Sequence, residues 1–319
     1  MAALAVAVGG FRAPAQASPP DPGPAGGAPR TFLETAFDQA RRLAVPVFVN
    51  GRGPFDFVVD TGSNVSVVAT EVAETCRLPE AGAALVHGIL SAEPTTLVAV
   101  SRLRVGKVIS AGLRLPRASA SRIGADGILG LDMLHSRRIV LDFQRQTFEI
   151  SPSDVGAQLG EARNSRLAAP NQPVTVPARF QDGQLVIIDA EAVGQPVTAF
   201  LDSGSQVTVA NGAVRAAALA RRPELANHLI HSELMSATGQ RAPAEFGVLP
   251  GLRLGGLPIE APLVAFANLH IFDLWDLQSR PTVLIGVDTL RRFDRVAFDF
   301  GRKLITFWPL TGPALRLPG

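Results

Sequence analysis

One short phrase occurs twice in the chain and constrains its fold more than any other feature. Residues 57–63 read Phe-Val-Val-Asp-Thr-Gly-Ser, and residues 199–205 read Ala-Phe-Leu-Asp-Ser-Gly-Ser. In each copy an apolar run typical of a buried strand leads directly into an aspartate, where burial makes the carboxylate charge costly. The hydroxyl residue and the glycine that follow are typical of a sharp turn. We therefore expect two buried strands that each deliver one carboxyl group to a turn.

The similarity extends beyond the two phrases. Setting Asp202 on Asp60, an offset of 142 (202 − 60), aligns the strand that enters each aspartate without a gap. Downstream, the Ile-Leu-Gly of residues 128–130 matches the Leu-Ile-Gly of residues 284–286 at an offset of 156 (286 − 130). A repeat of this length predicts two similar lobes with a shared core. The longer spacing predicts two loop insertions in the second copy, within residues 215–234 and 267–281.

Short apolar runs broken by Gly, Pro and Asn begin near Leu43 and continue along the chain. Such runs are typical of short strands, and their density predicts a mainly β barrel or sandwich. The strands expected in the first copy are residues 45–49, 55–59, 65–69, 96–105, 113–115, 139–143 and 147–150. Short helices are expected near residues 71–76, 130–136, 212–222 and 287–293.

The two copies divide the chain into lobes. We expect a first lobe at residues 31–155, a polar connector at 156–172 and a second lobe at 173–319. Residues 1–30 combine a short apolar run with a stretch too rich in Pro and Gly to pack, which is typical of a flexible leader. Ala15-Gln16-Ala17 has the form of a signal-peptidase site, although a basic segment is missing before the apolar run. A periplasmic or secreted location is expected, with a cytoplasmic one as the alternative.

Composition excludes several classes of protein. Hydrophobic residues make up 47% of the 319 and charged residues 18%, which is typical of a globular protein, and the formal net charge is only +2. No cluster of Lys and Arg interleaved with aromatic residues occurs, so nucleic-acid binding is not expected. The single Cys76 excludes an intrachain disulfide and a cysteine-based zinc site. No stretch approaches the roughly 20 apolar residues of a membrane span.

Other catalytic and metal motifs are weak. His228 and His231 have a spacing that could suit a metal, but no third ligand is evident, so neither a metal site nor a cofactor is expected. The Gly-x-Ser-x-Gly motif of a serine hydrolase is missing, and Cys76 lacks the local signature of a cysteine protease. Asp132 and Asp288 also recur in the repeat, and each is expected to cap a short helix.

The repeated aspartates predict a paired carboxyl site. Two similar lobes in one chain can meet across a pseudo-two-fold axis, which would bring Asp60 and Asp202 face to face. Two carboxyl groups about 3 Å apart cannot both ionise cheaply, so they share one proton. The ionised group can then take a proton from water while the protonated group donates to a carbonyl oxygen. This chemistry would hydrolyse a peptide bond without a covalent intermediate.

At these residues the chain resembles the retropepsin-like aspartic proteases, in a duplicated single-chain form. The resemblance covers about residues 43–150 and 183–309. It implies an all-β fold of two tandem retropepsin-like β-barrel lobes, endopeptidase activity on a peptide or protein substrate as a monomer, and a catalytic dyad of Asp60 and Asp202. The supporting residues that it implies are Thr61 and Ser203 for hydrogen bonds between the lobes, Gly62 and Gly204 for the turns, Ser63 and Ser205 for bonds to the outer carboxylate oxygens, and Ile128, Leu129, Gly130, Leu284, Ile285 and Gly286 for a psi-shaped element behind each loop.

The resemblance also implies two flaps, which are hairpins that close over the substrate and exclude water. One flap in each lobe resembles the retropepsin arrangement, and the chain has no Tyr, the residue that pepsin-like enzymes usually place on a single flap. His270 and Trp275 lie in the second insertion, where each would contact substrate or remain a surface or core residue. The flap candidates are His87, Gly88, Ile89 and Leu90 in the first lobe and Thr238 and Gly239 in the second.

Alternatives to this interpretation remain open. A lone aspartate before a turn commonly caps it, although two copies in matching contexts favour a catalytic pair. A protein with the same fold and both aspartates could bind peptides without cleaving them. A homodimer that buries the lobes differently could hold Asp60 and Asp202 apart.

Overall fold

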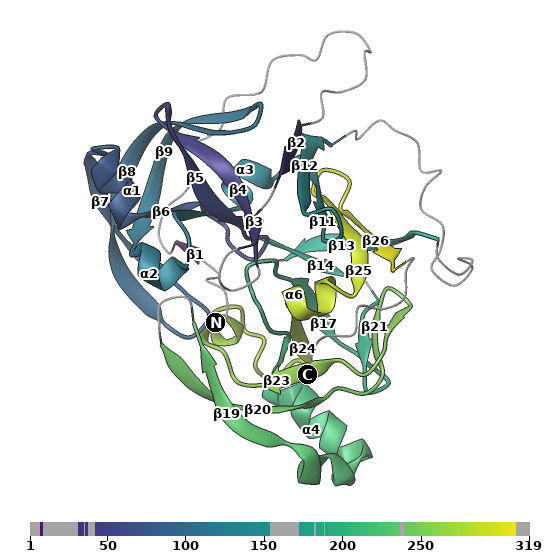
Figure 1. Cartoon of the computed structure of the whole chain (residues 1–319). Coiled ribbons are helices and arrows are strands. Elements are labelled where there is room, and N and C mark those ends of the chain that lie inside the picture. Colours follow the sequence, from purple (N-terminus) through teal and green to yellow (C-terminus); the bar gives the residue numbers. More distant parts are fainter. Residues whose placement is uncertain are drawn as a thin grey trace.

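The chain folds mainly as short strands arranged in two lobes (Figure 1). The structure is a computed structural model, and it describes residues 7–8, 31–34, 36–37, 42–153, 172–181, 183–187, 189–236 and 240–310. The expected leader, apart from residues 7–8, and nearly all of the expected connector lie outside the described residues. None of the described helices has the length and apolarity that a membrane crossing requires.

The first lobe is a closed six-stranded barrel with further strands at its edges. Asn50 and Gly51 connect the first two barrel strands with φ angles of 50° and 80°, as a two-residue hairpin turn requires. The edge strands are β7 (Glu80–His87), β1 (Ala7–Val8) and β3 (Ala36–Phe37). In spatial order the barrel strands are β4 (Leu43–Val49), β5 (Arg52–Val59), β10 (Gly127–Leu129), β6 (Val67–Ala69), β9 (Val108–Ala118) and β8 (Ala92–Val105), which pairs again with β4.

The second lobe is built on a 13-stranded sheet that includes strands from the first half of the chain. β11 (Arg137–Asp142) pairs with β25 (Phe293–Asp299), with Leu141 facing Val296, so one sheet joins the two halves. A smaller sheet contains β16 (Gln195–Pro196), β15 (Glu191–Ala192), β21 (Leu252–Leu254) and β22 (Leu257–Ile259). In spatial order the large sheet contains β19 (Ile230–Met235), β20 (Arg241–Val248), β23 (Leu263–Phe266), β18 (Val209–Ala210), β24 (Thr282–Ile285), β17 (Thr198–Leu201), β14 (Gln184–Ile187), β13 (Val174–Gln181), β26 (Leu304–Pro309), β25 (Phe293–Asp299), β11 (Arg137–Asp142), β12 (Thr147–Pro152) and β2 (Thr31–Glu34).

Short helices cover the ends of the sheets. α4 (Gly212–Arg221) overlaps the start of the first expected insertion of the second lobe, and the 3₁₀ helix η3 (Pro223–His228) lies within it. α5 (His270–Leu274) lies within the second expected insertion. α4 begins after Asn211, whose side chain accepts a hydrogen bond from the amide of Val214. The helices are α1 (Thr70–Thr75), α2 (Ala120–Ile123), α3 (Leu131–Leu134), α4 (Gly212–Arg221), the 3₁₀ helix η3 (Pro223–His228), α5 (His270–Leu274) and α6 (Val287–Leu290).

The predicted mainly β fold is confirmed, as one closed barrel and one large sheet. Every strand expected in the first copy is present, with ends that shift by a few residues. Alternation of buried side chains explains why these segments are strands: Val45, Val47 and Val49 of β4 are all fully buried in the barrel.

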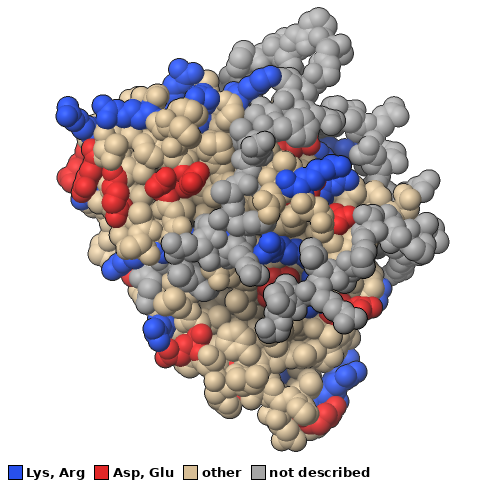
Figure 2. Space-filling view, viewed as in Figure 1, with Lys and Arg blue, Asp and Glu red and all other residues tan. Residues whose placement is uncertain are grey.

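Charged side chains are scattered over the surface. On the face shown in Figure 2, basic and acidic side chains lie in small mixed groups between larger uncharged areas, and the described residues of this face form no continuous basic surface. The small net charge agrees with this distribution.

Candidate active site

Two loops, one from each lobe, meet at the interface between the lobes. β5 delivers Asp60 and β17 delivers Asp202, and these residues are only 1% and 0% exposed. A parallel strand lies behind each loop, β10 behind the first and β24 behind the second. The amide of Asp60 donates to Leu129 O (3.1 Å), and the amide of Asp202 donates to Ile285 O (2.9 Å). The repeated Ile-Leu-Gly and Leu-Ile-Gly elements therefore support the two aspartates from behind.

Crossed hydrogen bonds between Thr61 and Ser203 hold the loops together. The Thr61 hydroxyl accepts from the amide of Ser203 (3.0 Å) and donates to Leu201 O (2.9 Å). The Ser203 hydroxyl accepts from the amide of Thr61 (3.0 Å) and donates to Val59 O (2.8 Å). All four bonds are buried and run between the lobes, so each loop is fixed by the other.

The glycines of the two loops allow the carboxyl groups to approach the opposite backbone. A Cβ atom placed on Gly62 would lie 2.5 Å from Asp202 Cγ, and one on Gly204 would lie 2.3 Å from Asp60 Cγ. Each glycine amide also donates to the carboxyl of its own loop, from Gly62 to Asp60 Oδ1 (2.8 Å) and from Gly204 to Asp202 Oδ1 (2.9 Å). The two carboxyls thus face each other across a gap that admits no side chain from either glycine.

The hydroxyls of the serines after the glycines bind backbone carbonyls and not the carboxylate oxygens that the resemblance implied. The Ser63 hydroxyl donates to Val65 O (2.7 Å), and the Ser205 hydroxyl donates to Val207 O (2.9 Å). A hydroxyl has one proton to donate, so these side chains close their own loops and leave the carboxylates to other donors. In the second loop the backbone amide of Ser205 donates to Asp202 Oδ1 (3.1 Å).

Two further pairs behind the loops were not recognised from the sequence. The Ser66 hydroxyl donates to Asp132 Oδ1 (2.6 Å) and accepts from the amide of Gly130 (3.0 Å). In the second lobe the Thr208 hydroxyl contacts Asp288 Oδ1 (2.7 Å) in the same way.

Asp132 and Asp288 were expected to cap helices. The N-cap positions of α3 and α6 are glycines, but the Asp288 carboxyl does accept from the amide of Thr289 (2.7 Å) in the first turn of α6. The two carboxyls also tie each loop to the element behind it. The recurrence of both carboxyl and hydroxyl at matched positions was the signal that could have revealed the pairs.

Burial raises the pKa of both facing carboxyls. Burial raises the pKa of Asp60 well above its usual value, and the facing Asp202 raises it further. Burial raises the pKa of Asp202 to about 6, although hydrogen bonds from Asp60, Gly204 and Ser205 act to lower it. The two carboxyls therefore titrate as a pair that retains a proton more readily than isolated carboxyls do. Asp202 Oδ2 is buried and receives no hydrogen bond from the residues that the structure describes.

The first-lobe flap is the hairpin of β7 and β8, and its tip is buried in the second lobe. Ile89 is fully buried in a hydrophobic cluster whose other members all belong to the second lobe. Leu90 packs against the same cluster. Trp275 also packs there and lies against Phe200, with ring centroids 4.9 Å apart. Trp275 is therefore part of the surface that receives the flap.

The second-lobe flap is the hairpin of β19 and β20. The amide of Ser236 donates to Gln240 O (2.8 Å) at the base of its turn. Thr238 and Gly239, the candidate flap residues here, lie outside the described residues.

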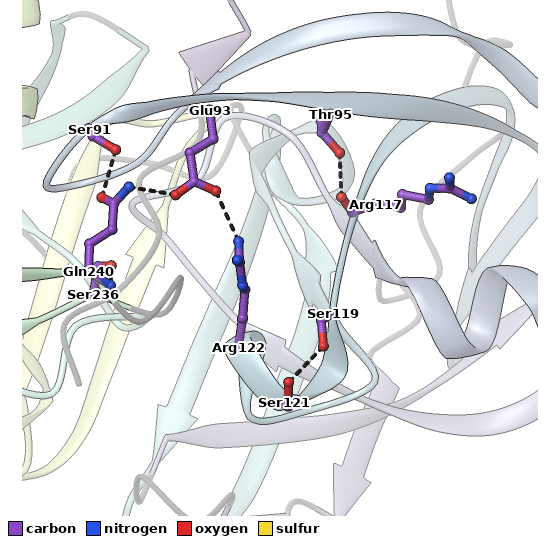
Figure 3. A network of polar contacts seen from close by, with 9 residues as sticks. All are labelled: Ser91, Glu93, Thr95, Arg117, Ser119, Ser121, Arg122, Ser236 and Gln240. Atoms are coloured by element: carbon purple, nitrogen blue, oxygen red, sulfur yellow. Dashed lines mark hydrogen bonds and ion pairs between the residues drawn. The ribbon is translucent and has the colours of Figure 1, made fainter.

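Polar contacts join the two flaps (Figure 3). The Ser91 hydroxyl donates to Gln240 Oε1 (2.6 Å), and Gln240 Nε2 donates to Glu93 Oε1 (2.5 Å). Arg122 approaches Glu93 from the other side, with Nη1 3.1 Å from Oε2. These contacts therefore join the two hairpins directly to each other.

Comparisons with known proteins agree with this geometry. Residues 45–133 match the sequence model of a family described as aspartyl protease. No curated protein sequence matches the chain. A crystal structure of an aspartic proteinase from Irpex lacteus matches with a TM-score of 0.52 at 12% sequence identity, over 90% of this chain and 99% of that chain. The fold is that of an aspartic proteinase.

The sequence match and the structural match cover different amounts of this aspartic proteinase fold. The family match includes Asp60 and the Ile-Leu-Gly element behind it but ends well before Asp202. The second loop lies outside the family match and is identified by its similarity to the first loop within the chain and by its contacts with it.

A contact between two histidines joins the lobes at the first flap. His87 ends β7, His270 begins α5, and His87 Nδ1 lies 3.1 Å from His270 Nε2. One nitrogen must donate and the other accept, so at least one ring must be neutral. Burial and the facing His270 lower the pKa of His87. A lowered histidine pKa means that the contact stabilises the closed flap above the ordinary pKa and loses this effect as pH falls.

We therefore expect the flap to loosen on acidification. The chain has two Trp residues, so the Trp308→Phe substitution leaves Trp275 as the single Trp whose fluorescence reports on the flap. Its emission should change as pH falls through about 6, near the ordinary histidine pKa. His270→Gln retains a hydrogen-bonding side chain without the charge and should suppress the change. An identical transition in the glutamine variant would contradict this expectation.

The crossed hydrogen bonds predict a stability effect. Thr61→Val keeps the side-chain shape but leaves Leu201 O and the amide of Ser203 buried without their partner. An unpaired buried polar group costs roughly 1–3 kcal/mol, so the variant should lose about 2–4 kcal/mol of unfolding free energy, measured by urea denaturation. Thr95→Val, which removes a hydroxyl bond within one lobe, is the matched control and should lose less. Equal losses of unfolding free energy in the two variants would show that the crossed bonds stabilise the protein no more than a hydroxyl bond within one lobe.

Proposed function

We propose that the protein is an aspartic endopeptidase in which Asp60 and Asp202 together activate a water molecule for attack on a peptide bond. The observation that carries the proposal is the buried pair of carboxyls, brought face to face from two loops of one chain. Both residues are nearly inaccessible, and the pKa of each is raised by burial. Structural ion-pair roles do not explain such a pair, because two like groups gain nothing from proximity unless they share a proton.

The contacts support a division of roles between the two aspartates. Asp202 accepts amide bonds from Gly204 and Ser205, which favour its ionised form. Ionised Asp202 then acts as the base that takes a proton from water, and Asp60 donates its proton to the carbonyl oxygen under attack. Asp202 then transfers its new proton to the amide nitrogen, and Asp60 takes back a proton from a hydroxyl of the diol intermediate as the C–N bond breaks. This releases the amine and the acid and restores the singly protonated pair.

The surroundings of the pair suit an extended peptide. Each lobe contributes one hairpin, β7–β8 and β19–β20, and closure of such hairpins as flaps would exclude water and orient a substrate. A cavity of about 100 Å³ beneath the first flap is bounded by Val67 and Val86 and by the charged side chains of Glu93, Arg117 and Arg122. We infer that this cavity receives one substrate side chain.

The finer proposal is a retropepsin-like enzyme in a duplicated, single-chain form that acts as a monomer. It is supported by the matched contacts of the two loops and by one flap in each lobe. Size measurement in solution together with inhibitor titration tests it. One inhibitor bound per monomeric chain is the expected result, whereas one inhibitor per two chains would require a site shared between chains.

Cleavage of a diverse peptide pool across pH, followed by mass spectrometry, tests the activity itself. Cleavage that a pepstatin-type inhibitor blocks is the expected result. Saturable peptide binding without cleavage at any pH would instead identify a peptide-binding protein on the same fold.

We also propose that the protein is exported. Ala15-Gln16-Ala17 after an apolar run supports this location. N-terminal sequencing of the protein recovered from cells should then begin after Ala17, and an intact Met1 would contradict export through this segment.

A further inference from the structure

A buried arginine and a glutamine occupy matching positions beside the two aspartates. The pairing register of β4 on β5, continued by two residues, places Arg42 opposite Asp60. The register of β14 on β17, continued by two residues, places Gln184 opposite Asp202. Arg42 and Gln184 are separated by 142 residues (184 − 42), the same offset as the two aspartates. The two positions are therefore counterparts, and one carries a positive charge that the other lacks.

Gln184 shows what a neutral residue does at this position. It is 2% exposed, and its Nε2 donates to Gly62 O (3.1 Å) and to Asn64 Oδ1 (2.7 Å). These bonds tie the second lobe to the first catalytic loop. A neutral amide is thus sufficient for a structural role beside the pair.

Arg42 is more costly to bury than its counterpart. It is 1% exposed, and its guanidinium donates to Ile123 O, the carbonyl at the end of α2. Burial of a cation costs more free energy than burial of an amide unless nearby negative charge offsets the cost. The facing dyad, which carries one negative charge when it shares a proton, supplies such an offset.

We propose that Arg42 is a positioning residue of the dyad, and that its buried positive charge holds the pair in the singly ionised form that catalysis requires. This inference rests on the proposed function, because it assigns a role in the same site. Removal of the charge should shift the titration of the pair to higher pH, since a nearby cation favours the ionised carboxyl.

The electrostatics of the pair agree with this role. Arg42 lowers the pKa of both Asp60 and Asp202, against the effect of burial. Other titratable groups close to the loops are in different contacts: Asp132 and Asp288 behind the loops bond Ser66 and Thr208, and His87 and His270 contact each other. The charges that act on each carboxyl are thus its partner and Arg42.

The test is a direct titration that does not depend on catalysis. Protein labelled with ¹³C at the aspartate carboxyl carbons is titrated by NMR, and Asp60→Asn and Asp202→Asn variants assign the signals. Arg42→Gln installs the residue found at the counterpart position. In this variant, the lower of the two apparent pKa values of the carboxyl pair should rise by about one unit. Arg42→Lys retains the charge and should titrate within about half a unit of the wild type.

Two results would overturn the proposal: an unchanged titration in folded Arg42→Gln, or a shift in Arg42→Lys as large as the one expected for glutamine. The lysine variant keeps the test decisive if the glutamine variant does not fold. The acidic limb of the kcat/KM profile should move with the NMR titration. If the wild type cleaves no peptide, the proposed function fails, and the NMR titration still decides the role of Arg42.

Discussion

Replacing Asp60 with asparagine should abolish peptide hydrolysis while the protein remains folded. Asparagine keeps the shape of the side chain and can still accept the amide bond of Gly62 (2.8 Å). It cannot hold the proton that the pair shares, so both the acid and the base function of the dyad are lost. Acid–base catalysis contributes roughly 10²–10⁴-fold for each group, so kcat should fall by at least about 10³-fold with little change in KM.

The control for this experiment is Asp126→Asn, which changes a carboxyl of the first lobe that accepts a bond from the amide of Asp56 (2.9 Å) outside the site. Its activity should match that of the wild type. Retained cleavage by the folded Asp60→Asn variant would contradict the assignment of Asp60 to the catalytic pair.

The same replacement should stabilise the fold at neutral pH. A carboxyl whose pKa is raised by folding contributes stability below its unfolded pKa, and this contribution is lost as pH rises through the folded value. Burial raises the pKa of Asp60 in this way, so its neutral replacement removes a cost that is present at neutral pH. The melting temperature of Asp60→Asn should therefore exceed that of the wild type at pH 7, and the two should converge near pH 3. A lower melting temperature at pH 7 would contradict the raised pKa.

Replacing Gly204 with alanine should reduce both activity and stability. The added methyl group would lie 2.3 Å from Asp60 Cγ and 2.4 Å from its Oδ2, so the loop or the carboxyl has to move. Overpacking of this kind costs about 1–3 kcal/mol. A displacement of about 1 Å at reacting groups can reduce the rate by about 10²-fold, and we expect kcat/KM to fall at least that far.

Gly212→Ala is the matched control, because this residue begins α4 and a methyl there meets only the side chain of Asn268, at 3.0 Å. Alanine favours helix, so the control should keep its activity and its stability. The measurements are kcat/KM and urea denaturation on both variants. Equal behaviour of the two alanine variants would show that the approach of Asp60 to Gly204 is not critical.

Much of the first lobe was predictable because its signals are local. Alternating valines predict β4, and the Asn50-Gly51 turn after it is determined by two adjacent residues. The pairing of Asp60 with Asp202 followed from the repeat, since matched loops in matched lobes can meet across an axis. The repeat also held information on Arg42, which aligns with Gln184 at the same offset as the aspartates.

Other features depend on contacts that a sequence pattern does not encode. The Ser63 and Ser205 hydroxyls bind carbonyls and not carboxylates, because the choice between a carboxylate and a nearby carbonyl depends on loop geometry. The sharing of one large sheet by both halves arises from the pairing of β11 with β25, which are far apart in sequence. The insertion of Ile89 into the second lobe is likewise a long-range contact.

The burial of Ile89 holds the first flap against the second lobe. Burying an isoleucine side chain is worth about 1.5–3 kcal/mol, so this contact alone disfavours withdrawal of the flap by roughly 10- to 160-fold. Under the proposed function a peptide enters only after the flap is withdrawn, so its apparent affinity is reduced by the same factor. Residue 89 therefore acts on all substrates alike: a smaller side chain there would increase encounter rates without changing which sequences are preferred.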